Sequence, residues 1–91
     1  MSAILRACES AGSQAALAKQ LNVTPAAVNQ WVSGGRPIPA ERCPAIEQAT
    51  AGSVTCEELR PDEPWSRIPD ETWPNPKGRP VLDFAAIKEA A

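Results

Sequence analysis

Histidine is absent from this 91-residue chain, which removes the commonest general base and a common metal ligand. No serine or cysteine has an obvious partner that would activate it as a nucleophile. Glu57 and Glu58 are neighbours in the chain, and consecutive helix residues point in different directions, so they read as solvated charges rather than an acid/base pair. Gly34-Gly35 lacks the Lys-Ser/Thr of a phosphate-binding loop. We therefore expect no enzyme, no cofactor and no metal.

Long apolar runs are also missing, as is the basic start and apolar stretch of a secretory signal. These absences predict a cytoplasmic protein with no membrane partner. The cysteines agree, because Cys8, Cys43 and Cys56 are odd in number, widely spaced and set among apolar helical positions. We expect reduced thiols in a core rather than disulfides.

What the chain does contain is a run, residues 14–33, that is typical of two short helices joined by a tight turn. Apolar residues at three-and-four spacing mark one face of each helix: Leu17, Ala18 and Leu21, then Val28, Trp31 and Val32. The two faces can close on one core, and a small residue such as Ala18 suits the helix crossing. The pattern predicts a helix-turn-helix in which Trp31 is a core residue.

The turn and the second helix have definite signals. Asn22 tolerates the left-handed backbone of a tight turn. Ser13 is a good N-cap for the first helix and Thr24 for the second, and Pro25 suits the first position of the second helix. The outward face of the second helix then carries small or amide-bearing residues: Ala26, Asn29, Gln30 and Ser33. An amide side chain can donate a hydrogen bond to adenine N7 and accept one from adenine N6. This face therefore suits a recognition helix in the major groove.

An ordinary helical hairpin with a polar outer face is the alternative interpretation. The net charge of -2 also weighs against DNA binding. However, the stretch between Glu9 and Glu41 contains no acidic residue, and it contains the cations Lys19 and Arg36. Arg36 suits a phosphate contact and a solvated loop cation equally. With so few cations a single copy should bind weakly, so we expect a homodimer on a palindromic site.

Further helices are expected on either side of this run. A first helix from Ala3 to Ala11 should turn Ile4, Leu5 and Cys8 inward. A fourth, over residues 40–50, should bury Cys43, Ile46 and Ala49. A capping box at residues 55–58 predicts a fifth helix of one or two turns.

The composition changes at Pro61, and residues 61–91 contain six of the ten prolines and six of the eleven acidic residues. Prolines favour extended or polyproline backbone, with a turn expected at residues 75–78 and a short helix from Asp83 onward. Trp65 should pack on its own domain. We expect the stretch from Trp73 to Ile87, which includes Val81, Leu82 and Phe84, to contact a second protomer or another protein.

Residues 12–18, 23–31 and 36–47, with the later residues 58–62, carry a family resemblance. On them the chain resembles the lambda-repressor-like, Cro-type regulators of temperate phages, and more closely the small YdaS-like proteins of prophages, which are described as antitoxins. The resemblance implies operator binding through the second helix, with a DNA face that includes Gln14, Thr24, Ala26, Asn29, Gln30 and Ser33. Asn22 stands where the family often has glycine.

Together these features predict an all-α fold: five short helices in a lambda-repressor-like helix-turn-helix domain, residues 1–60, followed by a proline-rich C-terminal arm, residues 61–91. The expected function is that of a sequence-specific transcriptional regulator that occludes a promoter by binding double-stranded DNA. The alternative is a protein-interaction module, such as an antitoxin that neutralises a protein partner. The candidate DNA-binding residues are Gln14, Lys19, Thr24, Pro25, Ala26, Asn29, Gln30, Ser33 and Arg36.

Overall fold

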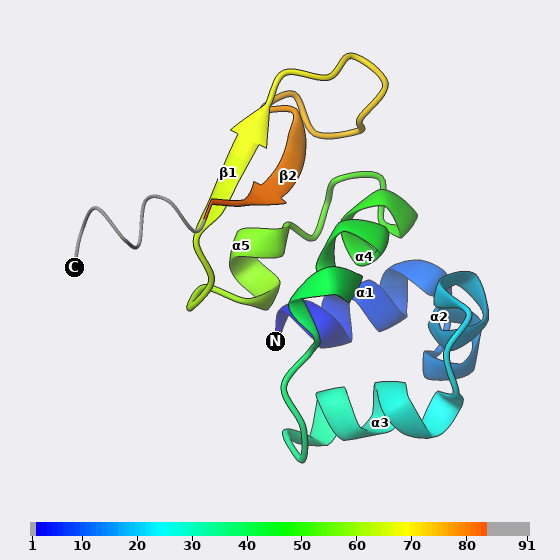
Figure 1. The fold of residues 1–91 in the computed structure, drawn as a ribbon. Helices are drawn as coiled ribbons and strands as arrows, with labels where there is room; N and C mark the ends of the chain where they lie inside the picture. Colours follow the sequence, from blue (N-terminus) through cyan, green and yellow to red (C-terminus); the bar gives the residue numbers. More distant parts are fainter. Residues whose placement is uncertain (1, 84–91) are drawn as a thin grey trace.

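The computed structural model describes residues 2–83, which form five α-helices, one 3-10 turn and a two-stranded antiparallel sheet (Figure 1). In chain order these elements are α1 (Ala3–Ala11), α2 (Gln14–Leu21), α3 (Pro25–Ser33), η1 (Ala40–Arg42), α4 (Cys43–Ala49), α5 (Cys56–Leu59), β1 (Trp65–Ile68) and β2 (Arg79–Leu82). No helix among residues 2–83 has the length and apolar character needed to cross a membrane.

The expected N-caps are confirmed. The Ser13 hydroxyl accepts the Ala16 backbone N–H at 3.0 Å and starts α2, and the Thr24 hydroxyl accepts that of Ala27 at 3.1 Å and starts α3. Thr55 forms the full capping box of α5 with Glu58. These short polar signals therefore set the register of each helix.

The turn between α2 and α3 has the predicted geometry. Asn22 lies in the left-handed region, at φ 57° and ψ 45°, and ends α2. The Val23 N–H then donates to the Ala18 carbonyl at 3.0 Å, which satisfies a carbonyl that the helix end would leave free. The turn thus fixes how α3 leaves α2.

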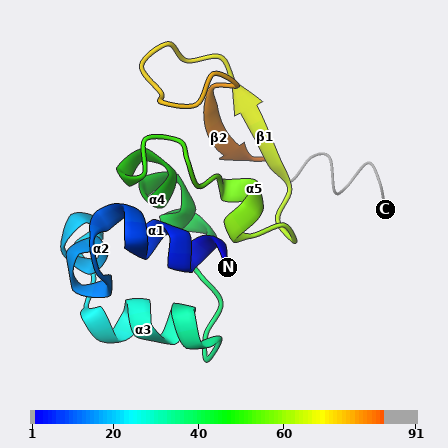
Figure 2. The same ribbon diagram turned by 180° about the vertical axis from the view of Figure 1, so that it is seen from behind.

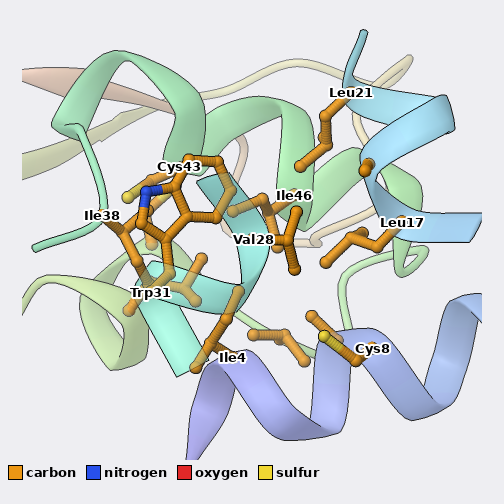
Figure 3. Packing of buried hydrophobic residues seen from close by; sticks show 14 residues of the cluster. Ile4, Cys8, Leu17, Leu21, Val28, Trp31, Ile38, Cys43 and Ile46 are labelled. Atoms are coloured by element: carbon orange, nitrogen blue, oxygen red, sulfur yellow. The ribbon is translucent and has the colours of Figure 1, made fainter. Parts of the chain in front are cut away.

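The helices enclose an apolar core that runs from α1 to α5. In Figure 3 the side chains of Leu17, Val28 and Ile46 point toward one another at its centre, and each is fully buried. Trp31 is only 8% exposed, which confirms that it is a core residue. All three cysteines are free and buried, as expected.

Two details of the helix predictions were wrong. Leu5 is 37% exposed, and Ala7 takes the inward position in α1. The fourth helix begins with η1 and continues as α4, because Pro44 lacks the N–H that an α-helical hydrogen bond to the residue 40 carbonyl requires. The second wrong detail is Ala49, which is exposed, whereas Glu47 and Thr50 are buried.

The all-α prediction was also wrong for the C-terminal part of the described chain. There β1 and β2 form a hairpin in which Trp65 pairs with Leu82 and Ile68 pairs with Arg79. The expected turn at the end of the connecting loop is confirmed by a 3.0 Å hydrogen bond from the Gly78 N–H to the Asn75 carbonyl. Gly78 has φ 99°, and a Cβ there would lie 2.0 Å from the Ile68 carbonyl oxygen. Only glycine therefore fits this close approach.

The register explains how a proline is accommodated in the hairpin. The Asp83 N–H donates to the Pro64 carbonyl at 2.8 Å, and hydrogen-bonded pairs alternate along an antiparallel ladder. Pro80, opposite Arg67, consequently falls at a non-hydrogen-bonded pair, where the ladder requires no N–H from it. On the outer edge of β2, Pro80 offers no backbone N–H donor, which disfavours the addition of another strand beside β2.

The hairpin is attached to the helices through a buried carboxylate. Glu47 of α4 has a fully buried side chain that accepts from the Arg67 guanidinium at 2.6 and 2.7 Å, from the Trp73 indole at 2.5 Å and from the Cys56 N–H at 3.0 Å. Burial alone would raise the pKa of Glu47, but these hydrogen bonds outweigh it and hold that pKa below its usual value.

These contacts test the two expectations for the C-terminal segment. Trp65 packs against the helical core, as predicted, and its indole N–H donates to the Arg60 carbonyl at 2.9 Å. Trp73 is also tied to the helices, because its indole donates to Glu47 of the same chain, and its contact with a partner stays a prediction. Phe84 and Ile87, and the helix expected after Asp83, lie outside the described residues.

Candidate DNA interface

Helix α3 lies at the end of the molecule opposite the hairpin, as the two views in Figures 1 and 2 agree. Eight of the nine predicted contact residues are exposed, and Gln14 is half-buried. Six of the exposed residues belong to α3 and its cap: Thr24, Pro25, Ala26, Asn29, Gln30 and Ser33. Lys19 lies in the last turn of α2, and Arg36 follows α3 after Gly34 and Gly35.

The first position of α2 meets the middle of α3 through a pair of amides. The Asn29 side-chain N–H donates to Gln14 Oε1 at 3.4 Å. This bond leaves the Gln14 amide nitrogen and Asn29 Oδ1 available for outside partners. Each residue was predicted separately to lie at the interface. Their hydrogen bond to one another depends on how α2 and α3 cross, and it has no local signal in the sequence.

Gln30 and Ser33, one turn apart on α3, differ in how free their side chains are. Among residues 2–83 no group forms a hydrogen bond with the Gln30 side-chain amide, which is exposed. The Ser33 hydroxyl, in contrast, donates to the Gln30 carbonyl at 3.3 Å and accepts the Gly35 N–H at 3.4 Å. Gln30 can therefore offer both a donor and an acceptor outward, whereas Ser33 stabilises the end of the helix.

The start of α3 has the features of a phosphate contact. Pro25 has no N–H, and the Ala27 N–H is taken by the Thr24 hydroxyl, which leaves the Ala26 N–H without a partner among the described residues. The helix dipole adds partial positive charge at this end. The Thr24 hydroxyl hydrogen remains free to donate.

The acidic residues are concentrated elsewhere and are largely paired. Arg67 binds Glu47 and Glu57, Arg60 binds Asp62 and Glu63, and Arg6 binds Glu58. Lys19 and Arg36, in contrast, form no ion pair within residues 2–83. The surface around α3 therefore keeps its positive charge available, although the whole chain is acidic.

Comparison with known proteins gives three matches. The family model described as bacterial toxin YdaS matches residues 4–68. YdaS of Escherichia coli strain K12, a candidate transcriptional regulator, is 61% identical over 63 residues, which are 69% of this chain and 64% of that protein. The Cro protein from the candidate prophage element Xfaso 1 of Xylella fastidiosa strain Ann-1 is a structural neighbour with a TM-score of 0.64 and 50% identity, over 68% of this chain and 94% of that one.

The chain spans less than two thirds of the length of the Escherichia coli relative, so the match covers only part of that protein. The family model extends from α1 to the end of β1 and stops before the hairpin loop. The resemblance to YdaS-like proteins and to Cro-type regulators is thus confirmed over the part of the chain that contains α2 and α3. The chain belongs to the bacterial toxin YdaS family.

Proposed function

We propose that this protein is a DNA-binding transcriptional regulator that places α3 in the major groove of an operator. The observation that carries the proposal is the exposed, uncharged face of α3, on which the Gln30 amide is free and Asn29 is held by Gln14. Such amides match the donor and acceptor groups of adenine. The similarity to a Cro protein and to a candidate regulator supports the same function.

In this arrangement Gln30 reads a base, and Asn29 reads a neighbouring base or a phosphate. The remaining candidates position the helix on the backbone: Gln14, Lys19, Thr24, Pro25, Ala26, Ser33 and Arg36. Because base contacts specify a sequence and phosphate contacts fix the register, the two groups should respond differently to a change of DNA sequence.

A second copy of the chain completes the proposal. One protomer offers two free cations, Lys19 and Arg36, near α3, and phosphate neutralisation supplies much of the affinity of such proteins. A two-fold dimer on a palindromic site doubles that contribution and gives half-sites about one helical turn apart. A protein of this kind acts in the cytoplasm and regulates by occluding a promoter.

The test is a gel-shift titration of the full chain against genomic fragments at several salt concentrations. We expect one fragment to bind in preference to random DNA, with an affinity that falls as salt rises. The Gln30→Ala variant should lose the preference for that fragment. Binding that is absent at low salt, or that never distinguishes fragments, contradicts the proposal.

The family description favours a second candidate, in which the protein acts on a protein partner within a toxin–antitoxin pair. The alternative drawn from the sequence was an antitoxin, whereas the family description names a toxin. Induced expression in a bacterial host separates the two functions. Growth arrest that persists in a Gln30→Ala variant lacking operator binding indicates an action that does not need DNA.

A further inference from the structure

The loop between β1 and β2 forms a small surface pocket that the DNA proposal does not use. Its volume is about 220 Å³, and it is lined by Pro69, Asp70, Glu71, Trp73, Asn75 and Pro76. The loop stands at the end of the molecule away from α3 (Figures 1 and 2). The family match ends with β1, so the pocket lies outside the matched residues.

Two carboxylates give the pocket its charge. Asp70 Oδ1 accepts the Thr72 hydroxyl at 2.6 Å and the Thr72 N–H at 2.9 Å, and these hydrogen bonds hold the pKa of Asp70 below its usual value. Its other oxygen lies 3.8 Å from the half-exposed Arg79 guanidinium, a loose pairing. Glu71 is exposed and binds no partner within residues 2–83.

The walls of the pocket are held in place. The Trp73 indole is anchored by its hydrogen bond to the buried Glu47. Asn75 is 8% exposed, and its Oδ1 accepts the Lys77 N–H at 2.9 Å. Lys77 itself is exposed and does not line the pocket. An indole surface, two proline rings and two carboxylates are therefore arranged before any ligand arrives.

We propose that this pocket binds an arginine side chain of a protein partner. A guanidinium pairs with carboxylates through its fork of N–H donors and stacks on an indole face, and both kinds of group line this pocket. The small volume admits one side chain, and the two carboxylates repel a nucleic-acid phosphate. The occupant is thus a cationic side chain and not DNA.

The position of the pocket would allow the protein to bind a partner and DNA at the same time. A partner seated on the loop lies at the opposite end from α3, so it can accompany the protein on an operator (Figure 1). This coupling rests on the DNA-binding proposal, whereas capture of arginine by the pocket does not.

The test is an NMR titration of the ¹⁵N-labelled full chain with N-acetyl-arginine amide, in the absence of DNA. We expect saturable shifts of the Trp73 indole and Asn75 amide signals, and much smaller shifts with the uncharged isostere N-acetyl-citrulline amide. In an Asp70→Asn/Glu71→Gln variant, which keeps the acceptor for Thr72, the affinity should fall about fivefold, as the loss of two exposed charge pairs implies.

Glu9→Gln is the matched control, because it removes an exposed carboxylate of α1 and should leave the titration unchanged. Citrulline shifts equal to those of arginine, shifts centred away from the loop, or an unchanged affinity in the double variant would overturn the proposal. Because no DNA is present, a negative result leaves the operator proposal standing, and a failed gel shift leaves the pocket standing.

Discussion

The helical part, residues 2–59, and the hairpin end, residues 60–83, differ in what their interiors contain. Among residues 2–83, every large apolar side chain that is fully buried belongs to the helical part. The hairpin end is attached by the Glu47–Arg67 ion pair and the Trp73 indole, with Trp65 adding a half-buried apolar contact. One part is thus held by apolar packing, and the other largely by charge and hydrogen bonds.

Because of this difference, the two parts should respond differently to a change of side-chain volume and to a change of charge. Apolar packing depends little on pH but strongly on side-chain volume. A buried ion pair contributes little net stability when intact, yet removal of one partner is costly because the other charge stays buried. Variants in the two parts should consequently fail in different ways, and neither failure should be mistaken for a loss of DNA contacts.

Trp31→Ala should have the largest effect. Truncation of a buried aromatic residue costs about 3–5 kcal/mol, which is a large share of the stability of a small domain. We expect the helical circular dichroism signal and the cooperative melt to be lost. A Trp31→Ala variant that keeps its helical signal but no longer binds DNA would instead place Trp31 at the interface.

Arg67→Met should be the next most damaging change, at about 3 kcal/mol, because it leaves the fully buried Glu47 without its main partner. Urea unfolding measures the loss. Arg6→Met is the matched control, since Arg6 and Glu58 form an exposed pair worth less than about 1 kcal/mol. Equal losses in the two variants would mean that the hairpin is not held by Glu47.

Acid should weaken the same attachment. The pKa of Glu47 is lower in the folded chain than its ordinary value of 4.5, so its stabilising contribution is complete above pH 4.5 and is lost as the pH falls through the folded pKa. The urea midpoint of the wild type should fall in that range. Arg67→Met should lose less on acidification, because protonation of an unpaired buried carboxyl relieves its cost. A parallel decline in both proteins would assign the acid sensitivity to other groups.

The hairpin attachment also marks the limit of what the sequence predicts. The caps at Ser13, Thr24 and Thr55 are local signals, and the structure confirms each of them. Glu47 shares the inward spacing of Cys43 and Ile46, so its burial had a signal. Its partner Arg67 lies 20 residues further on, in a strand that prolines obscure, and no local pattern connects the two.

The same distinction applies to the candidate interface. Helical register alone placed Ala26, Asn29 and Gln30 on the outer face of α3, and all three are exposed. The bond from Asn29 to Gln14 joins residues 15 positions apart and depends on the crossing of two helices. Local register is therefore predictable, while the contacts that orient a side chain come from the tertiary fold.

Gln30→Ala tests the interface without disturbing either interior. The side chain is exposed and has no hydrogen-bond partner among residues 2–83, so the melting temperature should not change. Affinity for the preferred DNA should fall by about 1–3 kcal/mol, with relaxed preference at one base position. Gel-shift titration against single-base variants of the site measures this. Equal losses on specific and random DNA would make Gln30 a phosphate contact.

Gln14→Ala should give the smallest effect. It removes the acceptor that holds Asn29, so the loss of DNA affinity should be about 0.5–1.5 kcal/mol, the net worth of one hydrogen bond. Gln20→Ala is the matched control, because Gln20 is an exposed amide of the same helix. If Gln14 acts through Asn29, the losses of Gln14→Ala and Asn29→Ala should not add in the double variant. Strict additivity would show that Gln14 contacts the DNA by itself, and an effect equal to that of Gln20→Ala would remove it from the interface.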